Sequence, residues 1–194
     1  MSETTLSREK ILEIAEEVLR RYGPSKATVV DVARALGVSH GSVYRHFGSK
    51  ADLRDAVTRV WLERFLEPLE QIVLEDASAA DRLHRWLREL SAAKRCRLSD
   101  DPELFATYCA LAAEAREVVG EHMDHLTGQV THLLRDGNAR GEWDLKDPAT
   151  ISRAVLCATA RFHNPAHTSE WSHPNIDKDF EEVWSLLLKG LKAS

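Results

Sequence analysis

The sequence predicts an all-helical protein in which a small N-terminal domain of three helices is followed by a larger helical bundle. Apolar residues make up 43% of the chain, and they recur at spacings of three and four residues, the period of an amphipathic helix. Leu and Ala outnumber Ile and Thr, which favours helices over strands. A length of 194 residues exceeds one small domain. We therefore expect two domains, residues 1–52 and 53–194, with about nine helices in total and no sheet.

The first two helices are predicted from their capping residues. Ser7 can cap a helix over residues 7–22, which a Gly-Pro pair then ends. Thr28 and Asp31 are spaced as in a capping box, so a second helix begins there. Gly37 stops this helix after barely two turns, because glycine accepts the left-handed conformation of a helix end.

A third short helix is predicted from Ser39, a natural N-cap, to Phe47. Gly48 then breaks the chain, and residues 49–52 open a fourth helix that connects the two domains. Two short helices around a tight turn are typical of a helix-turn-helix, whose second helix enters the major groove of DNA. A small residue in the second predicted helix, Ala33, allows the close packing that this motif needs.

The charge distribution agrees with a local nucleic-acid site. The formal net charge of −5 argues against a protein that coats nucleic acid over its whole surface. Residues 32–51, however, contain no Asp or Glu. The basic and titratable side chains of this window are Arg34, His40, Arg45, His46 and Lys50. The basic surface is therefore confined to the predicted helix-turn-helix.

Longer amphipathic helices follow in the second part of the chain. Pro68 is expected to kink or end the fourth helix. An apolar stripe marks a helix around residues 83–90, and Asp101 followed by proline begins the next. A long helix through residues 118–134 is expected to end at Asp136-Gly137. Asp147 followed by proline starts another helix, which Pro165 stops, and residues 164–175 form an irregular connection.

The last predicted helix carries a strong apolar stripe that needs a partner surface. Together with the helix that begins at residue 148, it suggests a two-fold, four-helix interface in a homodimer. Docking onto its own subunit is the alternative. The residues expected at the interface are Val155, Phe180, Val183, Trp184, Leu187, Leu188 and Leu191.

The helix-turn-helix segment also resembles a known family. Residues 28–50 read TVVDVARALGVSHGSVYRHFGSK, and this string is similar to the DNA-binding domain of TetR-family regulators, over about residues 7–55. The remainder resembles the family in architecture, with residues 140–142 similar to the turn before its penultimate long helix. The resemblance implies a double-stranded DNA operator, palindromic in keeping with a homodimer.

The resemblance also implies separate roles for individual residues. The N-terminal part of the third helix would lie against base edges, and the candidates for reading bases are His40, Gly41, Ser42 and Arg45. Arg45 is the first candidate, because a guanidinium can donate two hydrogen bonds to guanine. Side chains at positions like those that contact phosphates in the family are Thr28, Tyr44, His46 and Lys50.

The resemblance further implies a small-molecule ligand inside the C-terminal bundle that releases the protein from DNA. Most ligand pockets are apolar with few polar groups. Residues that fit such a lining are Trp86, Phe105, Tyr108, His122, Met123, Leu126 and Phe162. Plain core packing is the alternative for each of them. We expect no cofactor.

Two histidine pairs suggest a metal-responsive repressor as an alternative. His122 and His125 share a helix face, and His163 and His167 lie near the end of another helix. Imidazole nitrogens bind zinc or nickel, but no carboxylate or cysteine stands at an obvious ligand spacing beside them. The main interpretation therefore has no metal site.

Other classes of protein are less consistent with the sequence. An enzyme is disfavoured because no set of nucleophile, base and orienting group is recognisable. A helical dimer that acts through protein contacts remains an alternative. No run approaches the twenty apolar residues of a membrane span, and residues 1–5 are polar rather than a leader. Three widely spaced cysteines suggest neither a disulfide framework nor a paired-cysteine metal site, so we expect a cytoplasmic protein without a membrane partner.

Overall fold

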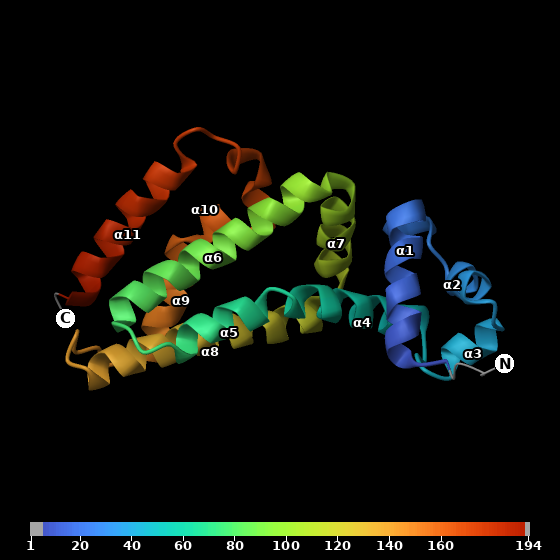
Figure 1. Cartoon of the computed structure of the whole chain (residues 1–194), viewed down its shortest axis with the longest axis horizontal. Helices are drawn as coiled ribbons and strands as arrows, with labels where there is room; N and C mark the ends of the chain where they lie inside the picture. Colours follow the sequence, from blue (N-terminus) through green and yellow to red (C-terminus); the bar gives the residue numbers. More distant parts are fainter. Residues whose placement is uncertain (1–5, 193–194) are drawn as a thin grey trace. The chain divides into compact units, whose positions relative to one another are not determined.

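A computed structural model describes residues 6–192 of the chain. Within them the structure is helical and contains no strand (Figure 1). The chain divides into two compact units. The first comprises Met1–Leu62 with Asp100–Gly120, and the second comprises Glu63–Ser99 with Glu121–Ser194. The division predicted at residue 52 lies inside a helix of the first unit, and the polar residues 1–5 lie outside the described part.

The first unit contains the predicted short helices. Its elements are α1 (Arg8–Lys26), α2 (Val29–Leu36), α3 (His40–Tyr44), α4 (Lys50–Glu63) and α7 (Pro102–Glu114). α1 is longer than predicted, but the chain does break at Gly23, where φ is 73°. α1 packs against α2 and α7. Ile11 and Val43 are fully buried in the core of this unit, and Trp61 of α4 stacks on Tyr108 of α7 at 4.6 Å between ring centroids.

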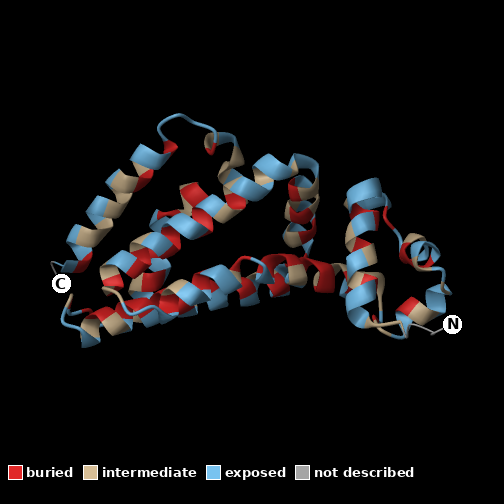
Figure 2. Ribbon diagram, in the orientation of Figure 1, coloured by how far each residue is buried: buried red, intermediate tan, exposed pale blue. Residues whose placement is uncertain are grey.

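The second unit is a bundle with one continuous apolar core (Figure 2). Its elements are α5 (Leu66–Leu74), α6 (Ala79–Asp100), most of α8 (Arg116–Ala139), α9 (Pro148–Ala158), α10 (Ala160–His163), the 3-10 helix η1 (Pro165–Glu170) and α11 (Ile176–Lys192). The predicted stripe of α6 is buried, with Leu83, Trp86 and Leu90 at 0% exposure. These side chains pack with residues of α8, α9, α10 and α11.

The described residues form eleven α-helices, where about nine are predicted. One addition is α5, because Pro68 lacks the N–H that would continue α4 and its ring clashes with the preceding turn. α4 therefore ends at Glu63 and α5 begins at Leu66. The other is α10, which a break at Thr159 separates from α9. The Thr159 hydroxyl donates to the carbonyl of Val155 at 2.9 Å at this break.

The prediction that α8 ends at Asp136-Gly137 places the end too early, since α8 continues to Ala139. Trp143 folds back over the helix and donates from Nε1 to the carbonyl of Leu134 at 2.8 Å. Its ring lies so close to Gly137 that a Cβ there would overlap the ring carbons of Trp143. Gly137 is therefore a site of close packing instead of a helix end.

The turn after α8 also caps another helix. Glu142 accepts hydrogen bonds from the backbone N–H groups of Ala79 and Ala80 at 2.6 and 3.0 Å. These are the first two residues of α6, so a carboxylate satisfies unpaired donors at the positive end of the helix dipole. Within residues 6–192 no helix is long and apolar enough to cross a membrane.

Candidate DNA interface and effector region

The start of α2 is set by a reciprocal cap. Thr28 Oγ1 accepts a hydrogen bond from the N–H of Asp31 at 3.2 Å, and Asp31 Oδ2 accepts from the N–H of Thr28 at 3.1 Å. The Thr28 hydroxyl also donates to Asp31 Oδ2 at 2.6 Å. Chiefly because of this hydroxyl bond, the pKa of Asp31 is below its ordinary value. The predicted capping box is confirmed.

The turn between α2 and α3 requires glycine. Gly37 has a φ of 68° and a ψ of 27°, the left-handed conformation that is strained for other residues. Its N–H bonds the last carbonyls of α2, and two residues later Ser39 caps α3 by accepting from the N–H of Ser42 at 3.2 Å. Val43 is then fully buried, which directs the opposite side of α3 to solvent.

The base-reading candidates lie on or directly after α3, which ends at Tyr44 instead of the predicted Phe47. His40, Gly41 and Arg45 are exposed, and Ser42 is half-buried. Arg45 Nη2 donates to Ser42 Oγ at 3.1 Å, and Ser42 Oγ lies 2.9 Å from Ser39 Oγ. A chain of short polar contacts thus holds the guanidinium on the exposed side of α3.

The phosphate-contact candidates lie around the same segment. Tyr44 is 43% exposed, and its ring meets that of His40 edge to face at 6.4 Å between centroids. Thr28 is exposed, while His46 and Lys50 are half-buried. Thr28 caps α2 and Lys50 is the first residue of α4. Each therefore stands at the start of a helix, the positive end of the helix dipole, and at α2 the capping box with Asp31 already occupies the N–H groups of Thr28 and Asp31.

One residue of this region was missed in the sequence. Arg8, the first residue of α1, places its guanidinium 4.4 Å from the ring centroid of Phe47. It also donates from Nη1 to the carbonyl of His46 at 3.3 Å. Arg8 therefore ties the start of α1 to the segment after α3 and adds an exposed positive charge beside it. Arg8 and His46 are 38 residues apart, so no local sequence pattern indicates that they meet.

The predicted effector-pocket residues are divided between the two units. Trp86, Leu126 and Phe162 belong to the core of the second unit. Phe105 and Tyr108 belong to α7 of the first unit, where both contact the ring of Trp61. Two further residues are in the second unit: Met123 is 39% exposed, and His122 is buried at 6% exposure.

The second unit also contains a groove of about 520 Å³ that the sequence did not reveal. It is lined by side chains of α5, α6, α10 and α11, with the predicted Phe162 among them. Ion pairs across it join Arg95 to Asp177 at 2.8 Å and Arg88 to Glu181 at 3.1 Å. Arg88 and Arg95 are thus matched by carboxylates of α11, and a third arginine of the lining, Arg85, pairs with Glu75 at the end of α5.

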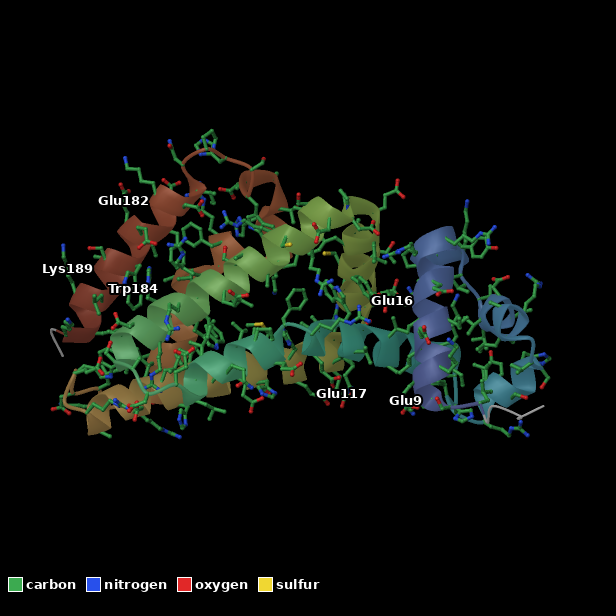
Figure 3. The ribbon with its side chains drawn as sticks, in the orientation of Figure 1. Glu9, Glu16, Glu117, Glu182, Trp184 and Lys189 are labelled. Carbon is green, nitrogen blue, oxygen red and sulfur yellow. The ribbon has the colours of Figure 1, made fainter. Side chains whose placement is uncertain are left out.

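The predicted dimer residues differ in burial. Three of them are in the core of the second unit: Val155, Phe180 and Leu191, at 2, 5 and 4% exposure. Four are half-buried along α11: Val183, Trp184, Leu187 and Leu188. Figure 3 shows Glu182 and Lys189 on the outer side of α11 and Trp184 on the inner side. Leu186, which the sequence analysis left out, is 72% exposed.

The two histidine pairs each combine a buried and a more exposed member. His122 and His163 are buried, His125 is exposed and His167 is half-buried with Nδ1 2.8 Å from Glu170 Oε1. Burial, helped by the charge of Lys94, lowers the pKa of His122 to about 3 and that of His163 to about 4. Across residues 6–192, no three His, Cys, Asp or Glu side chains are grouped so as to hold a metal ion.

Comparisons with known proteins agree on both parts of the chain. Residues 11–57 match the family described as "Bacterial regulatory proteins, tetR family", and residues 79–184 match "Tetracyclin repressor-like, C-terminal domain". The HTH-type transcriptional regulator TtgR of Pseudomonas putida is 36% identical, over 77% of this chain and 76% of its own.

Two further relatives cover most of the chain. The HTH-type transcriptional repressor BepR of Brucella suis is 26% identical, over 99% of this chain and 95% of its own. A crystal structure of the transcriptional regulator FadR from Bacillus subtilis in complex with stearoyl-CoA has a TM-score of 0.66 at 19% identity. It covers 95% of this chain and 99% of its own. At this identity the structural match supports the fold alone.

Proposed function

Because this chain belongs to the TetR family of bacterial regulators, we propose that it represses transcription by binding an operator and leaves the DNA when a small molecule binds its C-terminal part. It is a DNA-binding transcriptional regulator. We assign residues 1–52 to DNA binding and residues 53–194 to effector binding and dimerisation. Such a protein works in the cytoplasm as a regulator rather than an enzyme.

The observation that carries this proposal is the exposed face of α3. Gly41 and Arg45 are one turn apart and exposed, while Val43 on the opposite side is fully buried. Residues 32–51 contain no carboxylate to repel DNA. Arg45 is already held by Ser42, which limits the side-chain entropy lost when the guanidinium binds a base.

A homodimer supports the same function, since two recognition helices read two half-sites of a palindromic operator. α11 is suited to this role because its exposed Leu186 and half-buried Leu187 and Leu188 leave apolar surface on the single chain. Burying it against a second copy stabilises the pair by roughly 25 cal/mol per Å² of apolar surface. The effector role is supported by the relative whose structure contains stearoyl-CoA, a small ligand of that protein.

The proposal is tested by fluorescence anisotropy with labelled DNA from upstream of the protein's own gene, titrated at several salt concentrations. Lys50→Ala should weaken binding about equally on all sequences and reduce the salt slope by about 0.9, because one phosphate contact is lost. Arg45→Ala should instead lose discrimination of about 1–3 kcal/mol at one base position. Stoichiometry should be two protomers per full operator.

The matched control is Lys178→Ala. This lysine lies on α11 and is exposed, and the substitution removes the same charge at a distance in sequence from the helix-turn-helix. It should leave DNA affinity and salt slope unchanged. If Lys50→Ala and Arg45→Ala also leave the operator affinity unaltered, the recognition helix is not α3 and the proposal fails.

A further inference from the structure

The groove among α5, α6, α10 and α11 has the size of a small-molecule site. Its volume is about 520 Å³, and ligand pockets commonly measure about 300–1,000 Å³. The buried part of its lining is apolar, since Phe162, Phe180 and Ile176 are 2, 5 and 5% exposed. The rings of Phe162 and Phe180 meet edge to face at 5.2 Å between centroids. The groove can therefore receive an apolar body.

The arginines that line this groove are already paired with carboxylates of the same unit. The pairs are Arg95 with Asp177 at 2.8 Å, Arg88 with Glu181 at 3.1 Å, and Arg85 with Glu75. An anion that entered the groove would lose hydration, and it could gain a positive partner only by displacing one of these carboxylates. An uncharged ligand leaves all three pairs intact. The pairing therefore disfavours an anion.

The carboxylates of the groove disfavour a cation for a similar reason. Glu181 is contacted by two side chains of α6, because His84 Nε2 lies 2.9 Å from its Oε2 and Arg88 donates to its Oε1. An amine would have to displace one of these partners. Glu89, another carboxylate of the lining, is exposed to solvent, where an ion pair contributes little. The groove is thus best matched by a ligand without charge.

The paired arginines still offer hydrogen bonds to such a ligand. A guanidinium carries several N–H donors, and the contacts with α11 are made by Nη1 of Arg88 and Nη2 of Arg95. The hydroxyl of Ser91, by contrast, donates to the carbonyl of Phe162 at 2.8 Å. The polar groups available at the wall of α6 are therefore mainly donors. A ligand that uses them needs an acceptor oxygen.

We propose that this groove binds an uncharged ligand that has an apolar body and an acceptor oxygen, such as a ketone or an ester carbonyl. The body packs on Phe162, Phe180 and Ile176. The oxygen accepts from Arg88 or Arg95 without breaking their ion pairs. The inference rests on the proposed function, because it gives the place and the chemical class of the effector.

The groove also has a direct connection to the proposed dimer helix. Ile176, Asp177 and Phe180 of its lining belong to α11. The same helix carries Leu186, which is 72% exposed and which we assign to the contact with a second copy. A ligand in the groove contacts α11 and can shift it relative to α6. Binding in the groove should therefore change the dimer contact and lower the affinity for DNA.

The test uses isothermal titration calorimetry on the full chain with three probes that share a naphthalene body. These are 2-acetylnaphthalene, 2-naphthoate and 2-(aminomethyl)naphthalene. At about pH 7.5 the acid is ionised and the amine is protonated. We expect the ketone to bind about tenfold more tightly than either ion, since no ion pair has to break. If either ion binds as tightly as the ketone, or none of the three binds, the inference is overturned.

One variant tests the role of the ion pairs. Asp177→Asn keeps the shape of the side chain and removes the charge that compensates Arg95. The affinity for 2-naphthoate should rise about tenfold, because its carboxylate can now pair with Arg95, while the affinity for the ketone stays unchanged. Asp124→Asn, at an exposed position of α8, is the control and should change neither. No gain for 2-naphthoate in Asp177→Asn contradicts the inference.

A second variant tests the location. Ala92 lines the groove from α6 and is exposed, so Ala92→Phe fills the groove without disturbing the core. It should reduce the affinity for 2-acetylnaphthalene at least tenfold. Ala110→Phe, at an exposed position of α7, is the control and should leave this affinity unchanged. If Ala92→Phe binds the ketone as tightly as the wild type does, the site is not this groove and the inference fails.

Operator binding measured on the same preparation separates this inference from the proposed function. If the protein binds its upstream DNA but does not prefer the ketone, the effector class is wrong and the repressor function stands. If it prefers the ketone but binds no DNA, the site stands and the repressor function fails. A ketone that lowers the affinity of the wild type for DNA, but not that of Ala92→Phe, supports both.

Discussion

The helix-turn-helix and the second unit use their polar side chains in opposite ways. Around α2 and α3, hydrogen bonds join residues three apart, as in Thr28 with Asp31 and Ser42 with Arg45, and the groups are exposed. In the second unit, hydrogen bonds join distant segments: Ser91 donates to the carbonyl of Phe162, 71 residues away, and this bond is buried. The first arrangement orders exposed side chains within one helix turn, and the second joins helices that are distant in the sequence.

The hydrogen bonds of the two regions differ in how much they contribute to the stability of the fold. Exposed local bonds compete with water and each contributes little, whereas buried bonds act in a low dielectric and are costly to break. Arg82 illustrates the buried kind, since it donates to the carbonyl of Val73 at 2.8 Å and pairs with Asp136. Changes in the second unit should therefore affect stability most, and changes in the helix-turn-helix should affect DNA binding most.

The largest expected effect comes from the buried histidines of the second unit. Their pKa values, about 3 for His122 and about 4 for His163, are below the ordinary value of 6.5. Each histidine is neutral in the folded protein and takes up a proton when the protein unfolds below its ordinary pKa. The contribution of these histidines to stability is therefore fully present above pH 6.5, and it is lost as the pH falls toward their pKa in the folded protein. Between about pH 7.5 and about pH 5.5, each of the two histidines should lower the free energy of unfolding by about 1.4 kcal/mol.

Urea unfolding at several pH values checks this prediction. His122→Leu should remove roughly half of the pH dependence over that interval, because one of two titrating groups is lost. Equal stability of the wild-type protein at about pH 5.5 and at about pH 7.5 would contradict the prediction that both histidines are neutral in the folded protein.

A smaller effect is expected at Gly137, where Trp143 covers the helix. Gly137→Ala places a Cβ against a buried indole that is itself hydrogen-bonded. It should destabilise the protein by about 1–3 kcal/mol through overpacking. Gly128 on the same helix has nothing within 4 Å of a built Cβ. Gly128→Ala should stabilise the protein by about 0.5–1 kcal/mol. If both alanine variants have the same effect in thermal unfolding, Trp143 does not pack closely against Gly137.

The smallest effect on stability is expected at Thr28, in the helix-turn-helix. Thr28→Ala removes the cap of α2 and should cost about 0.5–2 kcal/mol. Thr28→Ser keeps the hydroxyl and should cost almost nothing. DNA affinity is measured on the same variants as urea unfolding, which separates the loss of the helix cap from the loss of a DNA contact. Thr28→Ala should weaken DNA binding while Thr28→Ser should not, and a loss of affinity in both would place the role of Thr28 in its methyl group.

Much of the fold was determined by the sequence itself. The capping box of Thr28, the left-handed Gly37, the cap at Ser39 and the proline-initiated helices all appear in the structure as predicted. The apolar stripe of α6 is buried as its period indicates. These features depend on residues within one turn of each other, so nearest neighbours are enough to specify them.

The contacts between distant segments are visible only in the folded chain. Arg8 over Phe47, Glu142 at the start of α6 and Trp143 across Gly137 join residues that no local pattern connects. The same holds for the effector region, where the structure sets Trp86 in one unit and Phe105 in the other. An apolar side chain can be buried in any core that excludes water. Its neighbours therefore depend on how the whole chain packs.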